Sequence, residues 1–301
     1  MAALNPLAPL AARLGRLGLG CATFGREIDE AAAFAVMDHA WAHGFTHFDT
    51  AASYSHGASE RIVGAWLAAR QPAEGSLLVA TKIKPPYTPD ALSAAVTASC
   101  RALGVARLDL LYLHQWDEAL RKRPTLEALD RLVRDGRVAT LGASNLHAGQ
   151  LATVLERQKD QGVARIEVLQ NNQNFAVRDV DDALRQLCRR EQVSLVTYSP
   201  LGAGFLTGKH KSGVEPGSRF DVMPGHQRVY FTPQAWTRLA ELEQLAARTG
   251  ESLAHLALVW AMHQPEVASV LIGGRSTAHL DQALRARHAP RPAWLEEIAP
   301  D

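Results

Sequence analysis

The sequence predicts a (β/α)8 TIM barrel, an α/β fold in which eight parallel strands alternate with helices around a closed sheet. Short apolar segments alternate with amphipathic segments of helical period along almost the whole chain. Polar residues that follow successive apolar segments recur roughly every 30 residues, which is about the length of one strand–helix unit. The length would also allow two smaller domains, but no change of composition divides the chain. We therefore expect one barrel domain over residues 1–301.

The first strand and helix of the barrel can be placed directly. Residues 17–22 form an apolar strand, and Asp29 can cap the helix that follows, which Gly44 ends. Residues 46–48 form the second strand. The glycines near the first strand follow a GxxGxG spacing rather than GxGxxG, and no helix start follows them. A Rossmann dinucleotide fold is therefore not predicted.

Two more strands are expected at residues 77–83 and 108–114. The second is almost wholly apolar, as a strand buried on both faces should be. Ser59 is the expected cap of the helix before residues 77–83, because the apolar residues after it recur at helical spacing. Thr88 caps the next helix, and Gly104 ends it.

The same rhythm continues in the second half of the chain. Further strands are expected at residues 138–142, 166–169, 194–197 and 267–272. Helices are expected near residues 125–135, 148–158, 179–191, 236–246 and 253–262, and from Ser276 or Thr277 to Leu284. The rhythm breaks at residues 201–232, a glycine-rich segment without helical period. We expect a long loop after strand 7 there, and such loops commonly bind ligands.

The composition argues against several classes of partner. The net charge is +1 and basic residues are mixed with acidic ones, so the sequence does not predict a basic surface for binding nucleic acid. No segment reaches the roughly 18 consecutive apolar residues of a membrane span. Residues 1–14 lack the basic start and unbroken apolar core of a signal peptide. Cys21, Cys100 and Cys188 are far apart without a CxxC pair, which predicts free thiols and a cytoplasmic location.

Side chains that can hold or move protons follow three neighbouring strands. Asp49 follows the second strand, Tyr54 lies in the loop after it, and Lys82 and His114 stand at the ends of the third and fourth. The C-terminal strand ends of such a barrel meet at one face, so we expect these four side chains to form a catalytic site. His47 shares the face of Asp49, but no further ligand completes a metal site. We expect a packed, hydrogen-bonded histidine and no metal.

The four side chains suit the reduction of a carbonyl group. A phenol with an ordinary pKa of about 10 is a poor acid at neutral pH. A neighbouring ammonium favours the phenolate, so we expect Lys82 to hold the pKa of Tyr54 below its ordinary value. Asp49 would keep Lys82 charged and oriented, and His114 would hydrogen-bond the substrate oxygen.

The order of these residues resembles the aldo-keto reductases, whose Asp-Tyr-Lys-His tetrad matches Asp49, Tyr54, Lys82 and His114. The similarity runs from about residue 17 to residue 284. It implies a barrel enzyme with NADP(H) as cofactor and a small carbonyl or alcohol compound as substrate.

The resemblance also implies a set of cofactor-binding residues. They are Ser144, Asn145 and Gln170 for the nicotinamide carboxamide, Tyr198 for its ring, the adjacent Ser199, Leu201, Gly202 and Gly204 for the pyrophosphate, and Gly274, Arg275 and Ser276 for the 2′-phosphate. The chain departs from the family at Gln173, where Tyr is frequent, and at Gln282 and Ala283, where Glu-Asn is frequent. Adenine contacts are therefore not carried over to the last two.

The sequence thus predicts an NADPH-dependent oxidoreductase that reduces an aldehyde or ketone to an alcohol by direct hydride transfer, with Tyr54 as general acid. Two alternatives stay open: NAD(P)-dependent oxidation of a sugar or alcohol by the same groups, and a cofactor-sensing regulatory subunit on the same fold. The incomplete ligand set disfavours a metal-dependent hydrolase. An apolar substrate pocket is expected from Phe24, Tyr87, Trp116 and Phe220 or Tyr230.

Overall fold

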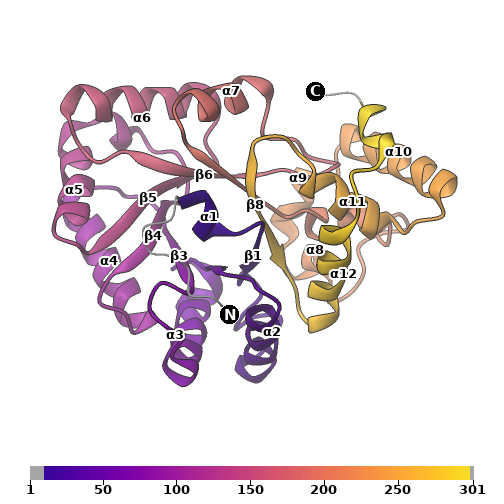
Figure 1. The fold of residues 1–301 in the computed structure, drawn as a ribbon, viewed down its shortest axis with the longest axis horizontal. Coiled ribbons are helices and arrows are strands. Elements are labelled where there is room, and N and C mark those ends of the chain that lie inside the picture. Colours follow the sequence, from indigo (N-terminus) through magenta and orange to yellow (C-terminus); the bar gives the residue numbers. More distant parts are fainter. Residues whose placement is uncertain (1–9, 299–301) are drawn as a thin grey trace.

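The computed structural model of the protein describes residues 10–298, and within them eight parallel strands close into a barrel in sequence order (Figure 1). This confirms the predicted fold. The strands are β1 (Leu17–Gly20), β2 (His47–Asp49), β3 (Leu78–Ile83), β4 (Leu108–Leu113), β5 (Val138–Ser144), β6 (Ile166–Asn172), β7 (Ser194–Tyr198) and β8 (Val267–Gly273).

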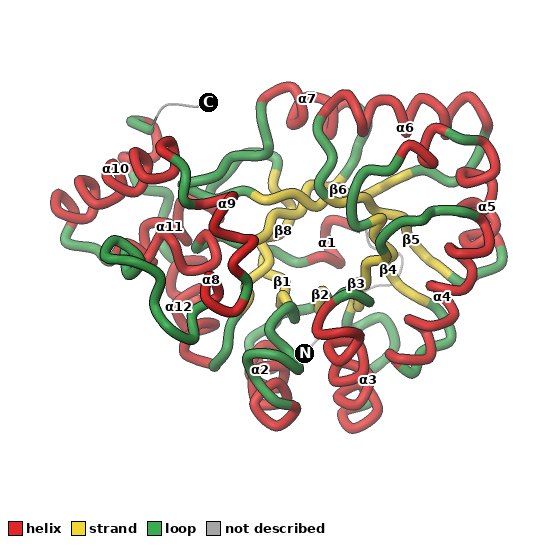
Figure 2. The backbone as a smooth tube through the Cα atoms, turned by 180° about the vertical axis from the view of Figure 1, so that it is seen from behind, coloured by secondary structure: helices red, strands yellow, loops and turns green. Residues whose placement is uncertain are grey.

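Helices surround this ring of strands, as Figure 2 shows from behind. The α-helices are α1 (Leu10–Leu14), α2 (Glu30–Ala42), α3 (Ala58–Arg70), α4 (Pro89–Leu103), α5 (Arg123–Arg134), α6 (Ala148–Gln161), α7 (Asp182–Arg190), α8 (Arg219–Val222), α9 (Gln227–Tyr230), α10 (Pro233–Thr249), α11 (Leu253–Met262) and α12 (Thr277–His288). Short 3₁₀ turns are η1 (Tyr54–Gly57), η2 (Glu118–Arg121), η3 (Gly202–Thr207), η4 (Pro224–His226) and η5 (Ala293–Glu296). No helix among the described residues combines the length and apolar character needed to cross a bilayer.

Most of the predicted helix caps are confirmed. The side chain of Asp29 accepts a hydrogen bond from the backbone at the start of α2, and Thr88 does the same for α4. Gly104 ends α4 in the left-handed conformation that glycine adopts without strain. Ser59 was wrongly expected to cap α3. Gly57 occupies the cap position, and Ser59 lies fully buried in the first turn.

Several elements begin or end at other residues than predicted. β5 and β6 continue through the polar residues Ser144 and Gln170, which are paired across the two strands. The apolar pattern stops earlier than the ladder does, because polar side chains do not prevent backbone pairing. α5 begins earlier than predicted, at Arg123 rather than residue 125. α7 begins later than predicted, at Asp182 rather than residue 179, and the side chain of Asp181 caps it.

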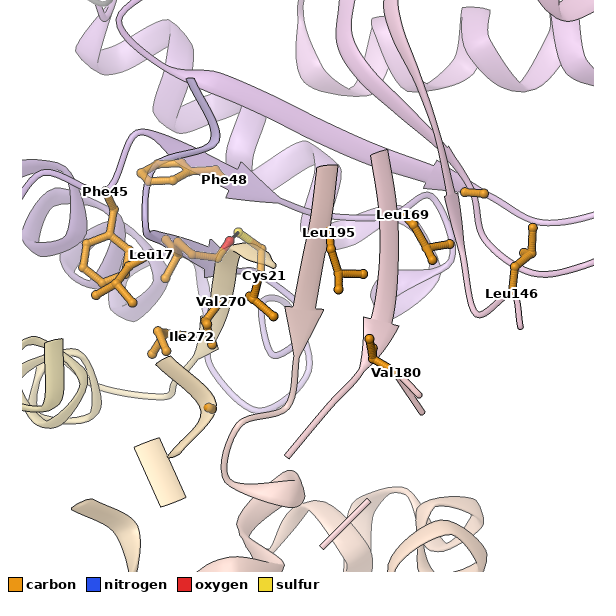
Figure 3. Packing of buried hydrophobic residues seen from close by; sticks show 14 of the residues in the cluster. Leu17, Cys21, Phe45, Phe48, Leu146, Leu169, Val180, Leu195, Val270 and Ile272 are labelled. Atoms are coloured by element: carbon orange, nitrogen blue, oxygen red, sulfur yellow. Dashed lines mark hydrogen bonds between the residues drawn. The ribbon is translucent and has the colours of Figure 1, made fainter. Parts of the chain in front are cut away.

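Two apolar layers hold the barrel together. The inner layer comes from strand residues that point into the barrel, such as Leu110, Val168 and Val196. The outer layer lies between strands and helices, and Figure 3 shows part of it, with Phe48 on β2 and Leu195 on β7. α1 lies across the N-terminal end of the barrel, where Leu14 joins the inner layer. Residues 1–9, which belong to the segment examined for a signal peptide, lie outside the described part of the chain.

The long segment after β7 has more structure than its sequence indicated. It contains η3, α8, η4 and α9, each too short to show a helical period. Its aromatic residues form a buried group in which Tyr230 stacks on Phe205 and meets Phe220 edge-on. Two contacts fasten its outer part to the barrel face: Arg219 pairs with Glu27 at 2.5 Å, and the guanidinium of Arg275 donates to the carbonyl of Gly217 at 3.0 Å.

Candidate active site

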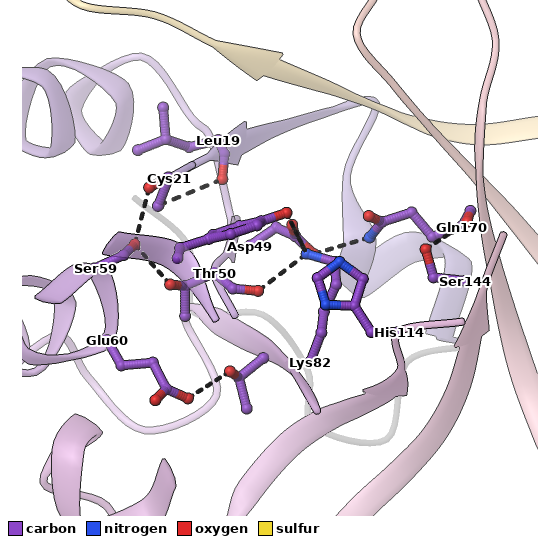
Figure 4. Close-up of polar contacts among 12 residues, drawn as sticks. Leu19, Cys21, Asp49, Thr50, Ser59, Glu60, Lys82, His114, Ser144 and Gln170 are labelled. Carbon is purple, nitrogen blue, oxygen red and sulfur yellow. Dashed lines mark hydrogen bonds and ion pairs between the residues drawn. The ribbon is translucent and has the colours of Figure 1, made fainter. Parts of the chain in front are cut away.

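The four expected catalytic side chains meet at the C-terminal end of β2, β3 and β4. Figure 4 shows three of them, Asp49, Lys82 and His114. The ammonium of Lys82 forms a short ion pair with Asp49 and donates to the phenol oxygen of Tyr54 at 3.4 Å. The ring of His114 stands edge-on to the ring of Tyr54, with centroids 5.9 Å apart. The geometry thus brings all four predicted residues into one group.

Lys82 is fully enclosed, and each of its three N–H groups has an acceptor. Besides Asp49 and Tyr54, it donates to the backbone carbonyl of Thr50 at 2.9 Å. An ammonium can only donate, so the oxygen of Tyr54 must be the acceptor. The hydrogen of the phenol is therefore left for another partner. Thr50 was missed by the sequence analysis, because a backbone carbonyl leaves no mark in the residue pattern.

The second oxygen of Asp49 accepts a hydrogen bond from the side-chain amide of Gln170 at 2.8 Å. Both Asp49 and Gln170 are almost completely buried. The carboxylate is therefore held from two sides, by Lys82 and by an amide from β6 on the far side of the barrel. This bond also orients Gln170, since its nitrogen faces Asp49 and its oxygen faces away.

The expected direction of the Tyr54 pKa is wrong. Although part of its ring is exposed, burial of the phenol raises the pKa of Tyr54 above its ordinary value, and the attraction of Lys82 offsets this only in part. Burial by itself would lower the pKa of Lys82, but Asp49 and Tyr54 more than compensate and raise it. The pair therefore consists of a neutral phenol and a charged ammonium at neutral pH.

His114 is a neutral imidazole under physiological conditions. Burial, together with the charges of Lys82 and Lys84, lowers the pKa of His114 to about 3. Its Nδ1 atom is buried without a hydrogen-bond partner among the described residues. A neutral ring next to the phenol can donate one hydrogen bond to a substrate oxygen without adding charge.

The backbone next to Tyr54 is strained. Ser55 and His56 have φ angles of 49° and 52°, a left-handed conformation that costs side-chain-bearing residues energy. The hydroxyl of Ser55 donates to the carbonyl of Phe24 at 2.8 Å, which fastens this turn to the loop after β1. The strain and the anchor together fix where η1 presents Tyr54.

The residues expected at the nicotinamide lie beside the tetrad. The hydroxyl of Tyr198 donates to Asn145 at 2.7 Å, and the amide of Asn145 donates to the carbonyl of His114 at 3.0 Å and to Ser144 at 3.1 Å. Asn171 was missed by the sequence analysis. It bonds both backbone groups of Leu146 and so fixes the loop that carries Asn145.

The glycine-rich turn after β7 has a left-handed backbone at several positions. Gly202 and Gly204 have φ angles of 58° and 95°, and Ser199 before them is also left-handed. A methyl group at Gly204 would lie 3.5 Å from the side chain of Lys209 and 3.9 Å from the ring of His210. Lys209 is a third residue missed by the sequence analysis. It is marked in the sequence only as a basic residue directly after Gly208, which ends η3.

The residues expected at the 2′-phosphate lie at the end of β8 and the start of α12. Arg275 and Ser276 are exposed, and the hydroxyl of Ser276 contacts the ring of His279 at 3.0 Å. Burial and the positive charges of Arg275 and Lys209 lower the pKa of His279. Arg275 and Lys209, from two different loops, therefore both contribute positive charge near His279, beside the N-terminus of α12. The free backbone amides of that helix end also favour an anion.

A model of the aldo/keto reductase family matches residues 16–293. The chain belongs to this family. Curated relatives of this aldo-keto reductase include norsolorinic acid reductase B of Dothistroma septosporum, with 28% identity covering 97% of this chain and 79% of that protein. Protein tas of Escherichia coli has 29% identity over 90% of this chain and 89% of its own length. Aflatoxin B1 aldehyde reductase member 4 of Homo sapiens has 29% identity over 89% and 87%.

Two expectations for this aldo-keto reductase need correction. Of the five aromatic residues expected to line a substrate pocket, Trp116 alone is partly exposed, whereas the others are packed in the core: Phe24, Tyr87, Phe220 and Tyr230. His47 is packed as expected, but neither of its ring nitrogens has a hydrogen-bond partner among the described residues. It lies against Gly18 inside the barrel, where burial lowers the pKa of His47 to about 4.

Three further features concern metal binding, the cysteines and the adenine contacts. Among residues 10–298, no three His, Cys, Asp or Glu side chains lie close enough to share a metal ion. The three cysteines carry free thiols. Ala283, which departs from the family's pattern, is fully buried on α12 and so offers no side chain for an adenine contact.

Proposed function

We propose that this aldo-keto reductase reduces an aldehyde or ketone to an alcohol, with NADPH as the reductant and Tyr54 as the general acid. The arrangement around Lys82 carries the proposal. Since the ammonium donates to the oxygen of Tyr54, the phenol hydrogen points to a different partner, and a substrate carbonyl is the partner that this chemistry needs. The names of two relatives, norsolorinic acid reductase B and aflatoxin B1 aldehyde reductase member 4, agree with the direction of reduction.

The role of each residue follows from its contacts. When bound, the cofactor would supply a hydride for the carbonyl carbon. Tyr54 donates its proton to the carbonyl oxygen, and Lys82 stabilises the phenolate that remains. His114, neutral at its lowered pKa, orients the carbonyl by a hydrogen bond. Asp49 keeps Lys82 charged and in place.

The residues present fit nicotinamide adenine dinucleotide phosphate. Gln170 turns its amide oxygen away from Asp49, which suits the acceptance of a hydrogen bond from the carboxamide, and Ser144 and Asn145 lie next to it. Tyr198 offers a planar face for the nicotinamide ring. The left-handed turn from Ser199 through Leu201, Gly202 and Gly204, together with Lys209, would hold the pyrophosphate, and Gly274, Arg275 and Ser276 would hold the 2′-phosphate.

The raised pKa of Tyr54 keeps the phenol protonated near neutral pH, which is the form that a general acid in carbonyl reduction needs. We further propose that residues 1–301 act as one catalytic domain in the cytoplasm, where NADPH and reduced thiols coexist, and that the partner is a small molecule.

The decisive experiment is an NADPH-oxidation assay of the purified protein against a panel of aldehydes and ketones, with bound metal measured on the same sample. Tyr54→Phe keeps the ring but removes the proton donor, so turnover should fall by about 10²- to 10⁴-fold. The affinity for NADPH should stay nearly unchanged. Tight NADPH binding without turnover of any carbonyl would instead favour a cofactor-sensing subunit. Activity above roughly a tenth of the parent rate in Tyr54→Phe would rule out Tyr54 as the acid.

A further inference from the structure

We infer that Thr50 and Ser59 are positioning residues, whose hydroxyl groups hold the ammonium of Lys82 beside Tyr54. The inference rests on the proposed function, in which Lys82 stabilises the phenolate of Tyr54. It concerns a chain of buried hydrogen bonds that joins β1, β2, β3 and the first turn of α3 (Figure 4).

This series of hydrogen bonds starts at the backbone carbonyl of Thr50, which accepts a hydrogen bond from Lys82 at 2.9 Å. Two of the three acceptors around Lys82 are side-chain atoms, of Asp49 and Tyr54. The third, the carbonyl of Thr50, belongs to the backbone, so its position is set by the peptide that carries it. This carbonyl therefore helps to define where the ammonium stays.

The peptide of Thr50 is in turn fixed through its side chain. The hydroxyl of Ser59 donates to the carbonyl of Cys21 at 2.8 Å, which uses its single hydrogen. The hydroxyl of Thr50, 2.7 Å from that of Ser59, must therefore be the donor between the two. All three residues are fully buried. The backbone N–H of Thr50 donates to Ala80 at 2.8 Å, so the residue is fastened at both ends.

The position of Lys82 matters because it is the one group facing Tyr54, among the described residues, whose charge favours the phenolate. The other titratable groups near the phenol are Asp49 on β2, Cys21 after β1 and His114 after β4. The charge of Asp49 opposes the phenolate, whereas burial raises the pKa of the Cys21 thiol and lowers the pKa of His114, so both are uncharged near neutral pH. A displaced Lys82 therefore makes proton donation by Tyr54 less favourable, while the binding surfaces for substrate and cofactor are untouched.

The test compares Thr50→Val, which keeps the shape but loses the hydroxyl, with Thr50→Ser, which keeps the hydroxyl. Thr50→Val should lower kcat by about tenfold, since small misplacements at a reacting centre have effects of this size. KM and the dissociation constant of NADPH should stay within about twofold of the parent values. Thr50→Ser should recover most of the rate. Ser59→Ala provides a second break in the same chain and should act in the same direction.

Thr125→Val is the matched control, because Thr125 is a buried threonine whose hydroxyl also donates to a backbone carbonyl, that of Tyr87 at 2.9 Å. It should leave kcat unchanged. A readout independent of turnover is the ¹⁵N-¹H resonance of the Lys82 ammonium, assigned by its loss in Lys82→Met. Because this ammonium is buried and fully bonded, its protons should exchange slowly, and faster in Thr50→Val and Ser59→Ala than in Thr50→Ser or Thr125→Val.

Equal losses of kcat in Thr50→Val and Thr50→Ser would assign the effect to packing of the threonine methyl and overturn the inference. An unchanged Lys82 resonance in Thr50→Val and Ser59→Ala would overturn it as well. If the resonance responds as expected but the parent protein reduces no carbonyl, the positioning role stands and the proposed function fails. The two proposals are therefore separable by the same set of variants.

Discussion

The hydrogen bond between Lys82 and Tyr54 has a fixed direction, and this makes the pH dependence of the reaction predictable. The ammonium donates and the phenol oxygen accepts. The pKa of Tyr54 is raised, and the pKa of His114 is lowered to about 3. Neither group changes its protonation near neutrality, so the acid and the orienting residue stay in their working forms.

We expect the kcat/KM of carbonyl reduction at saturating NADPH to be flat from about pH 5 to 9. It should fall only in the alkaline range, where Tyr54 loses its proton. In Lys82→Met the plateau should be lower and the alkaline fall should lie at higher pH, because the ammonium that favours the phenolate is gone. An inflection near pH 6.5 that disappears in His114→Asn would contradict the neutral state assigned to His114.

Arg275 should determine the preference for NADPH over NADH. A charge-assisted hydrogen bond contributes about 1.5 to 3 kcal/mol, so Arg275→Ala should weaken NADPH binding by roughly ten- to a hundredfold. The affinity for NADH should barely change. Arg287, an exposed arginine in the last turn of α12, supplies the control variant Arg287→Ala, which should bind both cofactors as the parent does. Fluorescence titrations measure both dissociation constants, and equal losses for the two cofactors in Arg275→Ala would contradict this assignment.

Individual site residues can be predicted from the sequence where a polar residue ends an apolar strand. Asp49, Lys82 and His114 stand out for this reason. It does not show the partners of these residues, because the carbonyl of Thr50 and the bond from Gln170 to Asp49 depend on strands far apart in the chain. The direction of the Tyr54 pKa was missed for the same reason, since the surroundings of a side chain exist only after folding.

Helices α3 and α4 are in close contact at a glycine. A methyl group at Gly64 on α3 would lie 2.5 Å from the carbonyl of Ala102 on α4 and 2.9 Å from the backbone of Leu103. Backbone atoms cannot rotate away as a side chain can, so the two helices must separate to admit it. The spacing of α3 and α4 is therefore set by the absence of a side chain.

Gly64→Ala should lower the free energy of unfolding by about 1 to 3 kcal/mol, despite the better helix propensity of alanine. Gly149 on α6 is the matched control, because a methyl group there would meet only the ring of His147 at 3.4 Å. Gly149→Ala should be neutral or slightly stabilising. Denaturant unfolding of both variants measures the difference, and similar values for the two would argue against close backbone contact between α3 and α4.

Element boundaries show where sequence periodicity stops being informative. The long helices were placed to within a few residues, because an apolar stripe needs several turns to be visible. α8 and α9 have four residues each and were missed. The segment that holds them folds through the burial of Phe205, Phe220 and Tyr230, and those contacts have no period in the chain.

The stability of the whole protein should depend on pH through His47. Its folded pKa of about 4 lies below the ordinary value of 6.5, so the unfolded chain takes up a proton first as the pH falls. This contribution to stability is complete above pH 6.5 and is lost towards pH 4. His47→Leu, which has a similar volume and does not titrate, should therefore lose less stability on acidification.

At pH 4.5 the difference in this loss should be about 2 to 3 kcal/mol, relative to pH 7. Denaturant unfolding of the parent and His47→Leu at both pH values measures it. His288→Gln controls for the removal of one histidine at an exposed position. If His47→Leu and the parent lose the same stability between the two pH values, His47 is not neutral in the folded barrel.

The closure of β1 against β8 also has a consequence for how the protein is made. The seam joins residues about 250 positions apart, as in the bond from Thr23 to Gly274, so a growing chain on the ribosome cannot complete it until almost all of the protein has been synthesised. The tetrad from Asp49 to His114 emerges early, while the backbone of β1 still lacks its second neighbour. During translation this open strand edge can pair with another polypeptide.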